Sequence, residues 1–280
     1  MKVQSTKAMS ALEIPSKTFL CGEYSVLRGH RALIFTHAPF FRCELKEQSG
    51  EYFHPESPAG RLEVLLTGSQ QRWSFEDPHA GLGGFGGSTA EYICVYKSLK
   101  PEGDVQDAVK MYFDLFKAHK TEPSGADLVS QYWATEAFTV FSKNPLKFEE
   151  TFWPFDDVSI LVYKTEYKVP THKHLEKIDS SSYWKLGQIS DECVQAFLDC
   201  DSNIFFKSLR EFSLEQQNQK LLLQESFETT ETLNALDGVI FSRGCGAMGA
   251  DVLALFVKKR RLDYVEAEVE KMNLGLKRVL

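Results

Sequence analysis

The residues with the clearest chemical potential are the glycine and hydroxyl residues between Gly81 and Tyr92. Glycine lets backbone amide groups turn toward a ligand and approach it closely, because no Cβ stands in the way. A helix that begins at Ser88 or Thr89 would direct its free N–H groups and the positive end of its dipole into this loop. The segment therefore predicts an anion site, most naturally for phosphate. The predicted contact residues are Gly83, Gly84, Gly86, Gly87, Ser88 and Thr89.

Three other interpretations of this glycine segment are weaker. A flexible linker is not usually followed by a well-formed helix start. Gly81, Gly83 and Gly86 match the G-x-G-x-x-G pattern of NAD(P)-binding oxidoreductases, but Asp77-Pro78-His79 stands where that pattern needs a strand. A Walker-type phosphate loop needs a lysine before the Ser/Thr, and Gly87 occupies that position.

The elements that would position this site come in runs of strands and runs of helices. Apolar, β-prone patterns predict strands at 14–20, 31–41, 41–46, 61–67, 133–141, 158–164, 237–242 and 252–257. Helical periodicity predicts helices after the glycine segment, after Asp104, and at 183–200, 202–223 and 261–272. A second glycine-rich loop, 243–250, joins the last two long strands. This order favours an α+β fold with two lobes, at 1–150 and 151–280.

Composition excludes several classes of function. The 280 residues are 43% hydrophobic with a net charge of −7, which argues against nucleic acid as the main partner. The longest apolar runs are too short to span a bilayer, and the polar N-terminus lacks the apolar region of a signal peptide. The six cysteines are scattered, which favours structural thiols in a reducing cytoplasm over a disulfide frame or a zinc site. We therefore expect a cytoplasmic protein that contacts neither membrane nor nucleic acid.

Four separated stretches occur in the same order as the motifs of the GHMP family of small-molecule kinases. They resemble, in turn, the first motif of that family, its glycine-serine phosphate loop, the segment with its catalytic aspartate and its C-terminal glycine-rich motif: residues 14–33, 81–90, 123–127 and 242–257. A fifth stretch, 158–172, is similar to the mevalonate-pathway members. The resemblance implies a two-lobed α+β fold in which ATP and an acceptor bind between the lobes.

The resemblance also implies which side chains carry out phosphoryl transfer. Asp127 matches the catalytic aspartate and Lys17 the cation beside it. A carboxylate at the acceptor hydroxyl can take its proton as the new bond forms, and a neighbouring cation keeps that carboxylate ionised. Without the motif order, the same residues would be interpreted as an ordinary helix-start aspartate and a solvated lysine.

The Mg²⁺ that accompanies ATP needs oxygen ligands, often a hydroxyl and a carboxylate. Ser88 matches the serine that lies near the metal in the family. The position of the family's acidic ligand, about three helical turns before the catalytic aspartate, holds Leu115 and Phe116 here. The neighbouring Asp114 is therefore the candidate ligand.

The resemblance implies a small anionic acceptor of the mevalonate pathway, either mevalonate or phosphomevalonate, with Glu23, Thr171 and Gly246 as candidate binding residues. Glu23 could equally bridge backbone amides in its own turn, and Thr171 could serve in packing. Met248 interrupts a motif that is commonly all glycine. This departure keeps open a second interpretation, a catalytically degenerate relative that binds a nucleotide or metabolite. The expected state is a monomer or a homodimer.

Overall fold

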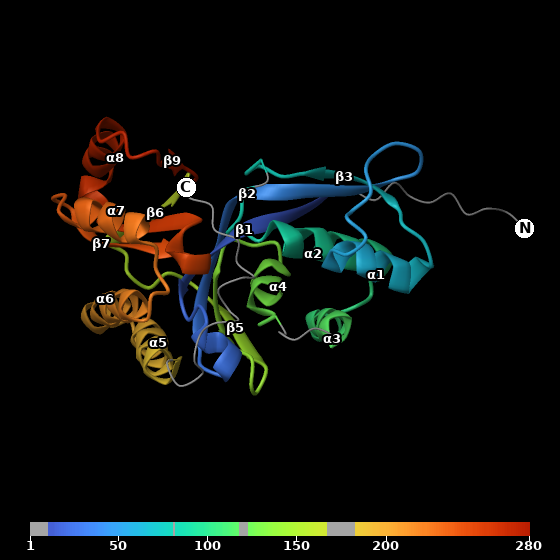
Figure 1. Cartoon of the computed structure of the whole chain (residues 1–280), viewed down its shortest axis with the longest axis horizontal. Coiled ribbons are helices and arrows are strands. Elements are labelled where there is room, and N and C mark those ends of the chain that lie inside the picture. The colour runs from blue at the N-terminus through green and yellow to red at the C-terminus, as the bar shows by residue number, and fades with distance from the viewer. Residues whose placement is uncertain (1–10, 81, 118–122, 167–182) are drawn as a thin grey trace, which may run out of the picture.

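The chain forms two lobes, each built around an antiparallel β-sheet (Figure 1). The structure is a computed structural model that describes residues 11–80, 82–117, 123–166 and 183–280. It confirms the predicted two-lobed α+β fold. The chain passes from one sheet to the other between Thr151 and Val158, beside the predicted boundary at residue 150. That each half is a domain in its own right stays a prediction.

The first lobe is a five-stranded sheet in which one long strand organises the others. Residues 32–35 of β2 pair with β4, and residues 42–46 pair with β3, so these two strands share one edge of β2 while β1 follows the other. The strands are β1 (Leu12–Cys21), β2 (Ala32–Lys46), β3 (Arg72–Glu76), β4 (Phe138–Ser142) and β5 (Lys147–Thr151). The helices are α1 (Pro58–Thr67), α2 (Gly87–Leu99), α3 (Val105–Phe116) and α4 (Ala126–Gln131), with a 3₁₀ turn at Ser25–Arg28.

The second lobe has a four-stranded sheet in the order β7-β8-β6-β9. Its strands are β6 (Val158–Lys164), β7 (Val239–Cys245), β8 (Val252–Lys258) and β9 (Lys277–Arg278). Its helices are α5 (Tyr183–Leu198), α6 (Ser202–Asn218), α7 (Gln224–Asn234) and α8 (Leu262–Lys271), with 3₁₀ turns at Ala247–Gly249 and Lys259–Arg261. Helices α5 and α6 pack side by side below the sheet in Figure 1. Across the described ranges, every helix is too short or too polar to cross a bilayer.

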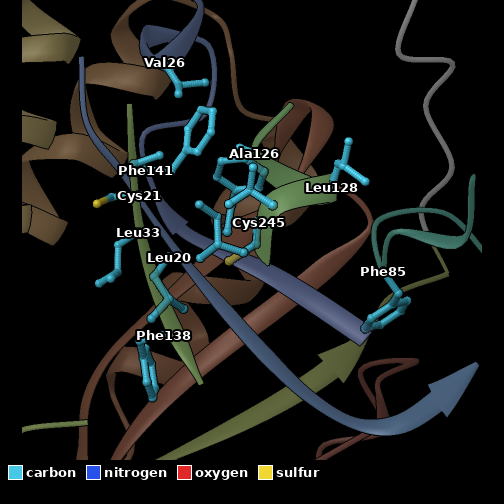
Figure 2. Packing of buried hydrophobic residues seen from close by; sticks show 14 of the residues in the cluster. Leu20, Cys21, Val26, Leu33, Phe85, Ala126, Leu128, Phe138, Phe141 and Cys245 are labelled. Atoms are coloured by element: carbon cyan, nitrogen blue, oxygen red, sulfur yellow. The ribbon is translucent and has the colours of Figure 1, made fainter. Parts of the chain in front are cut away.

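The hydrophobic core runs through both lobes. Residues of β8 alternate between two buried clusters: Val252, Ala254 and Phe256 join the larger one, whereas their neighbours face α8. This period of two is what a strand buried on both faces produces. Figure 2 shows side chains of the larger cluster, from Leu33 on β2 to Cys245 at the end of β7. The lobes therefore share one packed interior behind the site described below.

Two predictions of secondary structure were wrong in ways that the local sequence explains. Residues 61–67 belong to helix α1 and not to a strand. The side chain of Ser57 accepts a hydrogen bond from the amide of Gly60, and Pro58 occupies the first turn, which together form a regular helix start. The two strands predicted at 31–41 and 41–46 form one continuous strand, β2.

The expectation that all six cysteines are thiols was also wrong. Cys43 on β2 and Cys94 on α2 form a disulfide, with their Cα atoms 6.1 Å apart. The two residues are 51 positions apart in the chain, and only the packing of α2 against the sheet brings them together. The other four are free: Cys21, Cys193 and Cys245 are buried, and Cys200 is exposed.

Candidate active site

A cleft of about 480 Å³ lies where the glycine segment of the first lobe faces the glycine-rich turn of the second. All six predicted phosphate-contacting residues line it, together with Lys17, Asp127 and Gly246. Four independent sequence predictions therefore converge on one place: the loop, the cation, the aspartate and the C-terminal glycine turn. Its lining also includes Phe75, Asp77, Leu82, Glu91, Tyr112 and Asp251.

The glycine segment adopts a backbone that larger residues would not fit. Gly84 and Gly86 have φ values of +90° and +88°. A Cβ on Gly84 would lie 2.5 Å from the Cβ of Asp251, and one on Gly86 would lie 2.5 Å from Oε1 of Gln131. Gly86 is the N-cap of α2, so the free amide groups of this helix start at the wall of the cleft. The arrangement is suited to a phosphate group, as the sequence predicts.

Lys17 and Asp127 form an ion pair, with 3.1 Å between Nζ and Oδ2. Lys17 comes from β1 and its side chain is only 7% exposed, whereas that of Asp127, in the first turn of α4, is 32% exposed. The other carboxylate oxygen of Asp127, Oδ1, is buried and has no hydrogen-bond partner within the described ranges. This carboxylate therefore retains capacity for one more donor, which a hydroxyl group of a bound molecule would supply.

Backbone and side-chain hydrogen bonds connect this ion pair to the glycine segment. The amide of Lys17 donates to the carbonyl oxygen of Phe85 at 3.0 Å. Oγ1 of Thr89 lies 2.8 Å from Oε1 of Gln131, and Nε2 of Gln131 donates to the carbonyl oxygen of Pro15. Thr89 thus connects α2 to α4 and β1, whereas Ser88 is exposed in the cleft. The Lys17–Asp127 pair and the glycine segment are positioned by one shared network.

Phe85, which lengthens the glycine loop relative to the family motif, is an anchor. Its ring stacks on His79 with 3.8 Å between centroids, and Nε2 of His79 lies 2.6 Å from Oγ of Ser16. Burial lowers the pKa of His79 to about 4, so the imidazole is neutral near pH 7. The insertion therefore fastens the loop to β1 and does not fill the cleft.

Three carboxylates that line the cleft were not predicted from the sequence: Asp77, Glu91 and Asp251. Glu91 could have been predicted as a site residue, because it follows Ser88 by three positions on the same helix and so lies on the same face. Asp77 and Asp251 follow a strand and a glycine turn, and no local pattern marks them. Asp251 lies between the two glycine segments, with a carboxylate oxygen 3.5 Å from the place of a Cβ on Gly83.

The cleft has the donor chemistry of an Mg²⁺–nucleotide site. Among its described lining residues, Lys17 is the one basic side chain, against four carboxylates. Such a cleft would repel phosphate groups unless a cation balanced the charge. In the described part of the chain, no three His, Cys, Asp or Glu side chains group into a metal site of their own. The metal would therefore be held by Ser88, a cleft carboxylate, the phosphates and water.

Asp114 is not the carboxylate of this site. It pairs with Lys117 at 2.6 Å at the end of α3 and does not line the cleft. The estimate by helical turns failed because α3 ends at Phe116 and a separate helix, α4, begins at Ala126, so the two positions share no common helical register. Asp77, Glu91 and Asp251 replace it as candidate ligands.

Glu23 lies outside the cleft and has a structural partner. Its carboxylate accepts hydrogen bonds from Nη2 of Arg243 at 3.0 and 3.2 Å, and both side chains are almost fully buried. The next residue, Tyr24, accepts a hydrogen bond from the amide of Met248 through its hydroxyl. The turn at Gly22 thus supports the glycine turn of the other lobe. Thr171 lies outside the described residues.

The titration of Glu91 provides a first test of this site. Burial, followed by the charge of Asp77, raises the pKa of Glu91 from 4.5 to about 7. The folded protein then binds a proton that the unfolded chain releases, so the stabilisation is complete below pH 4.5 and disappears as pH rises to 7. The free energy of unfolding relative to Glu91→Gln should therefore fall by about 2 kcal/mol between pH 5 and pH 7.5, at ~1.4 kcal/mol per pKa unit. Urea unfolding of both proteins measures this difference, and parallel pH profiles would contradict it.

The fold is shared with several solved small-molecule kinases. The mevalonate kinase of Methanococcus jannaschii superposes with a TM-score of 0.73 at 14% identity, over 99% of this chain and 100% of that one. The phosphomevalonate kinase of Streptococcus pneumoniae gives 0.75 at 16% identity over 98% and 99%. The galactokinase of Lactococcus lactis gives 0.70 at 11% identity over 96% and 92%. The resemblance to GHMP kinases is thus confirmed at the level of the fold.

The comparisons by sequence add nothing to this result. No protein-family model matches the chain, and no curated protein matches it significantly. The phosphomevalonate kinase of S. pneumoniae has also been solved in complex with phosphomevalonate and AMPPNP, an ATP analogue, and this complex has a TM-score of 0.75 with the chain. The family fold therefore holds nucleotide and acceptor together in that relative.

Proposed function

We propose that the chain is an ATP-dependent small-molecule kinase that uses Lys17 and Asp127 at the acceptor. The observation that carries this proposal is the ion pair of 3.1 Å at the wall of a cleft that two glycine segments enclose. Phosphoryl transfer requires mainly that the reacting groups are positioned and that positive charge surrounds the transferred group. The N-terminus of α2, the glycine amides and Lys17 supply both.

In this proposal each side chain has a separate task. Asp127 accepts the proton of the acceptor hydroxyl as its oxygen bonds to the γ-phosphorus of ATP and ADP leaves. Lys17 holds Asp127 in place through their ion pair and stabilises the charge that develops on the transferred group. Mg²⁺, if held here, would supply positive charge to the phosphate oxygens. Ser88 and a cleft carboxylate would hold the metal, and the amides of Gly84 to Ser88 orient the phosphates.

The proposed acceptor is mevalonate or phosphomevalonate. The sequence motifs resemble those of mevalonate-pathway kinases, and kinases of these two acceptors are among the similar structures. Galactokinase and homoserine kinase share the fold as well, with TM-scores of 0.70 and 0.66. The fold alone therefore does not choose the acceptor, and the choice rests on motif resemblance and on experiment.

The proposal is tested by measuring ADP release with Mg²⁺-ATP and, in turn, mevalonate, phosphomevalonate, galactose and homoserine. We expect turnover with one of the first two acceptors and none without acceptor. Turnover of galactose or homoserine alone would keep the kinase and reject the pathway. ATP binding by calorimetry without turnover of any acceptor would favour the alternative, a catalytically degenerate relative that binds a nucleotide or metabolite. An absence of ATP binding would reject both.

A further inference from the structure

A second cavity of about 300 Å³ lies within the C-terminal lobe, between α6, α7 and β7. It shares no lining residue with the cleft. Its walls are mixed in character, and the apolar part is formed by Leu214, Leu222, Phe227, Ile240 and Phe241. A volume near 300 Å³ is at the lower end of the range for small-molecule sites. The cavity is therefore large enough for a small ligand with an apolar body.

Two polar groups of this cavity lack a hydrogen-bond partner among the described residues. Oγ of Ser213 and Nε of Arg243 are buried and have no hydrogen-bond partner in the described part of the chain. Arg243 is only 1% exposed, so water does not readily satisfy its Nε–H group. Buried donors of this kind are costly unless another group accepts from them. The cavity wall thus contains buried donors that a hydrogen-bond acceptor on a ligand would stabilise.

Arg210 adds a positive charge at the same wall. Its guanidinium lies over the ring of Phe241, with 5.4 Å to the centroid, and donates to the carbonyl oxygens of Phe206 and Ile240. Within the described ranges, no carboxylate forms an ion pair with it, and the one acidic residue that lines the cavity, Glu231, is exposed. An anionic acceptor would balance this charge, whereas a cationic ligand would be repelled.

We propose that this cavity is a binding site for a small carboxylate with an apolar tail. The carboxylate accepts from Arg210, Ser213 and Arg243, and the tail packs against Phe227 and Leu222. Charge-assisted hydrogen bonds of this type are stronger than those between neutral groups. This proposal of ligand binding does not depend on the proposed kinase activity.

The cavity is also connected to the cleft through α7. The amide of Leu223 donates to the carbonyl oxygen of Met248, and Oγ of Ser226 donates to that of Gly249. Leu222, in the cavity wall, contacts Gly249 so closely that a Cβ there would lie 2.2 Å from its Cδ1. Gly246 of the same turn lines the cleft. Occupancy of the cavity is therefore linked to nucleotide affinity, a coupling that rests on the proposed function.

Hexanoate is a suitable probe, with hexan-1-ol and hexylammonium as head-group controls at constant ionic strength. Saturation-transfer NMR and thermal denaturation of the full chain measure binding. We expect hexanoate to bind more tightly than either control, and Arg210→Gln to weaken it by about 10-fold or more. Ser213→Phe, which fills the cavity, should abolish binding. Arg260→Gln removes an exposed arginine of the same lobe and should leave binding unchanged.

Two outcomes would overturn the site. Hexanol binding as tightly as hexanoate would mean an apolar cavity without head-group recognition. Hexanoate binding that survives both Arg210→Gln and Ser213→Phe would place the ligand elsewhere. Calorimetry of ATP with and without saturating hexanoate then tests the coupling, for which we expect a change in the dissociation constant of about fivefold or more. Hexanoate binding with unchanged ATP affinity would reject the coupling, and a protein that binds hexanoate but not ATP would reject the proposed function alone.

Discussion

Replacing Asp127 with Asn is expected to lower kcat by about 10²- to 10⁴-fold, the range that a positioned general base contributes. The amide keeps the shape of the carboxylate but cannot take the proton of the acceptor hydroxyl. Because Asp127 faces the acceptor and the phosphates rest on the glycine amides, the dissociation constant of Mg²⁺-ATP should change by less than about threefold. Steady-state ADP release and calorimetry measure the two quantities.

The variant Asp156→Asn serves as the matched control, because it removes one carboxylate from an exposed position outside the cleft. It should retain full activity. If Asp127→Asn turns over at the rate of the unmodified protein, Asp127 is not the base and the proposed mechanism fails. A loss of both turnover and ATP binding would instead show that the pair with Lys17 maintains the shape of the cleft.

Local patterns predicted those elements whose sequence shows a clear period or cap. The strand predicted at 158–164 is β6 with the same bounds, because most of its residues are apolar and of types that favour strands. Helix α3 begins as predicted after Asp104, whose side chain accepts a hydrogen bond from the amide of Asp107. The helix at 58–67 was missed although Ser57-Pro58 marks its start, since its apolar residues also alternate in a strand-like way.

The candidate site was predictable where the order of the motifs indicated which distant residues lie together in the fold. One cleft is lined by the six loop residues and by Lys17, Asp127 and Gly246. Of these, Lys17 and Gly246 are 229 positions apart in the chain (246 − 17). Asp77 and Asp251 were missed because neither lies in a periodic segment. Asp77 belongs to the same lobe as the glycine segment, whereas only the approach of the two lobes brings the carboxylate of Asp251 to it. Glu23 was assigned to the acceptor because nothing local to it indicates Arg243, its partner 220 residues further on.

This pair of Glu23 and Arg243 leads to the largest expected effect on stability. Arg243, on β7, donates to the carboxylate of Glu23, to Oε1 of Gln216 and to the carbonyl oxygen of Leu20. Both charged side chains are at most 7% exposed. Arg243→Met should lower the free energy of unfolding by about 3–5 kcal/mol, because it leaves a buried carboxylate without its counter-charge. Urea unfolding at pH 7 measures the loss.

A double variant separates the charge from the packing. Glu23→Leu combined with Arg243→Met removes both charges and keeps apolar volume, and an apolar replacement of a buried ion pair is often neutral or stabilising. The double variant should therefore be more stable than Arg243→Met alone, with Arg260→Met, an exposed position, within about 0.5 kcal/mol of the unmodified protein. If the double variant were less stable than the single one, an uncompensated carboxylate would not be what destabilises Arg243→Met. Glu23 would then stabilise its turn by contacts other than the buried charge pair.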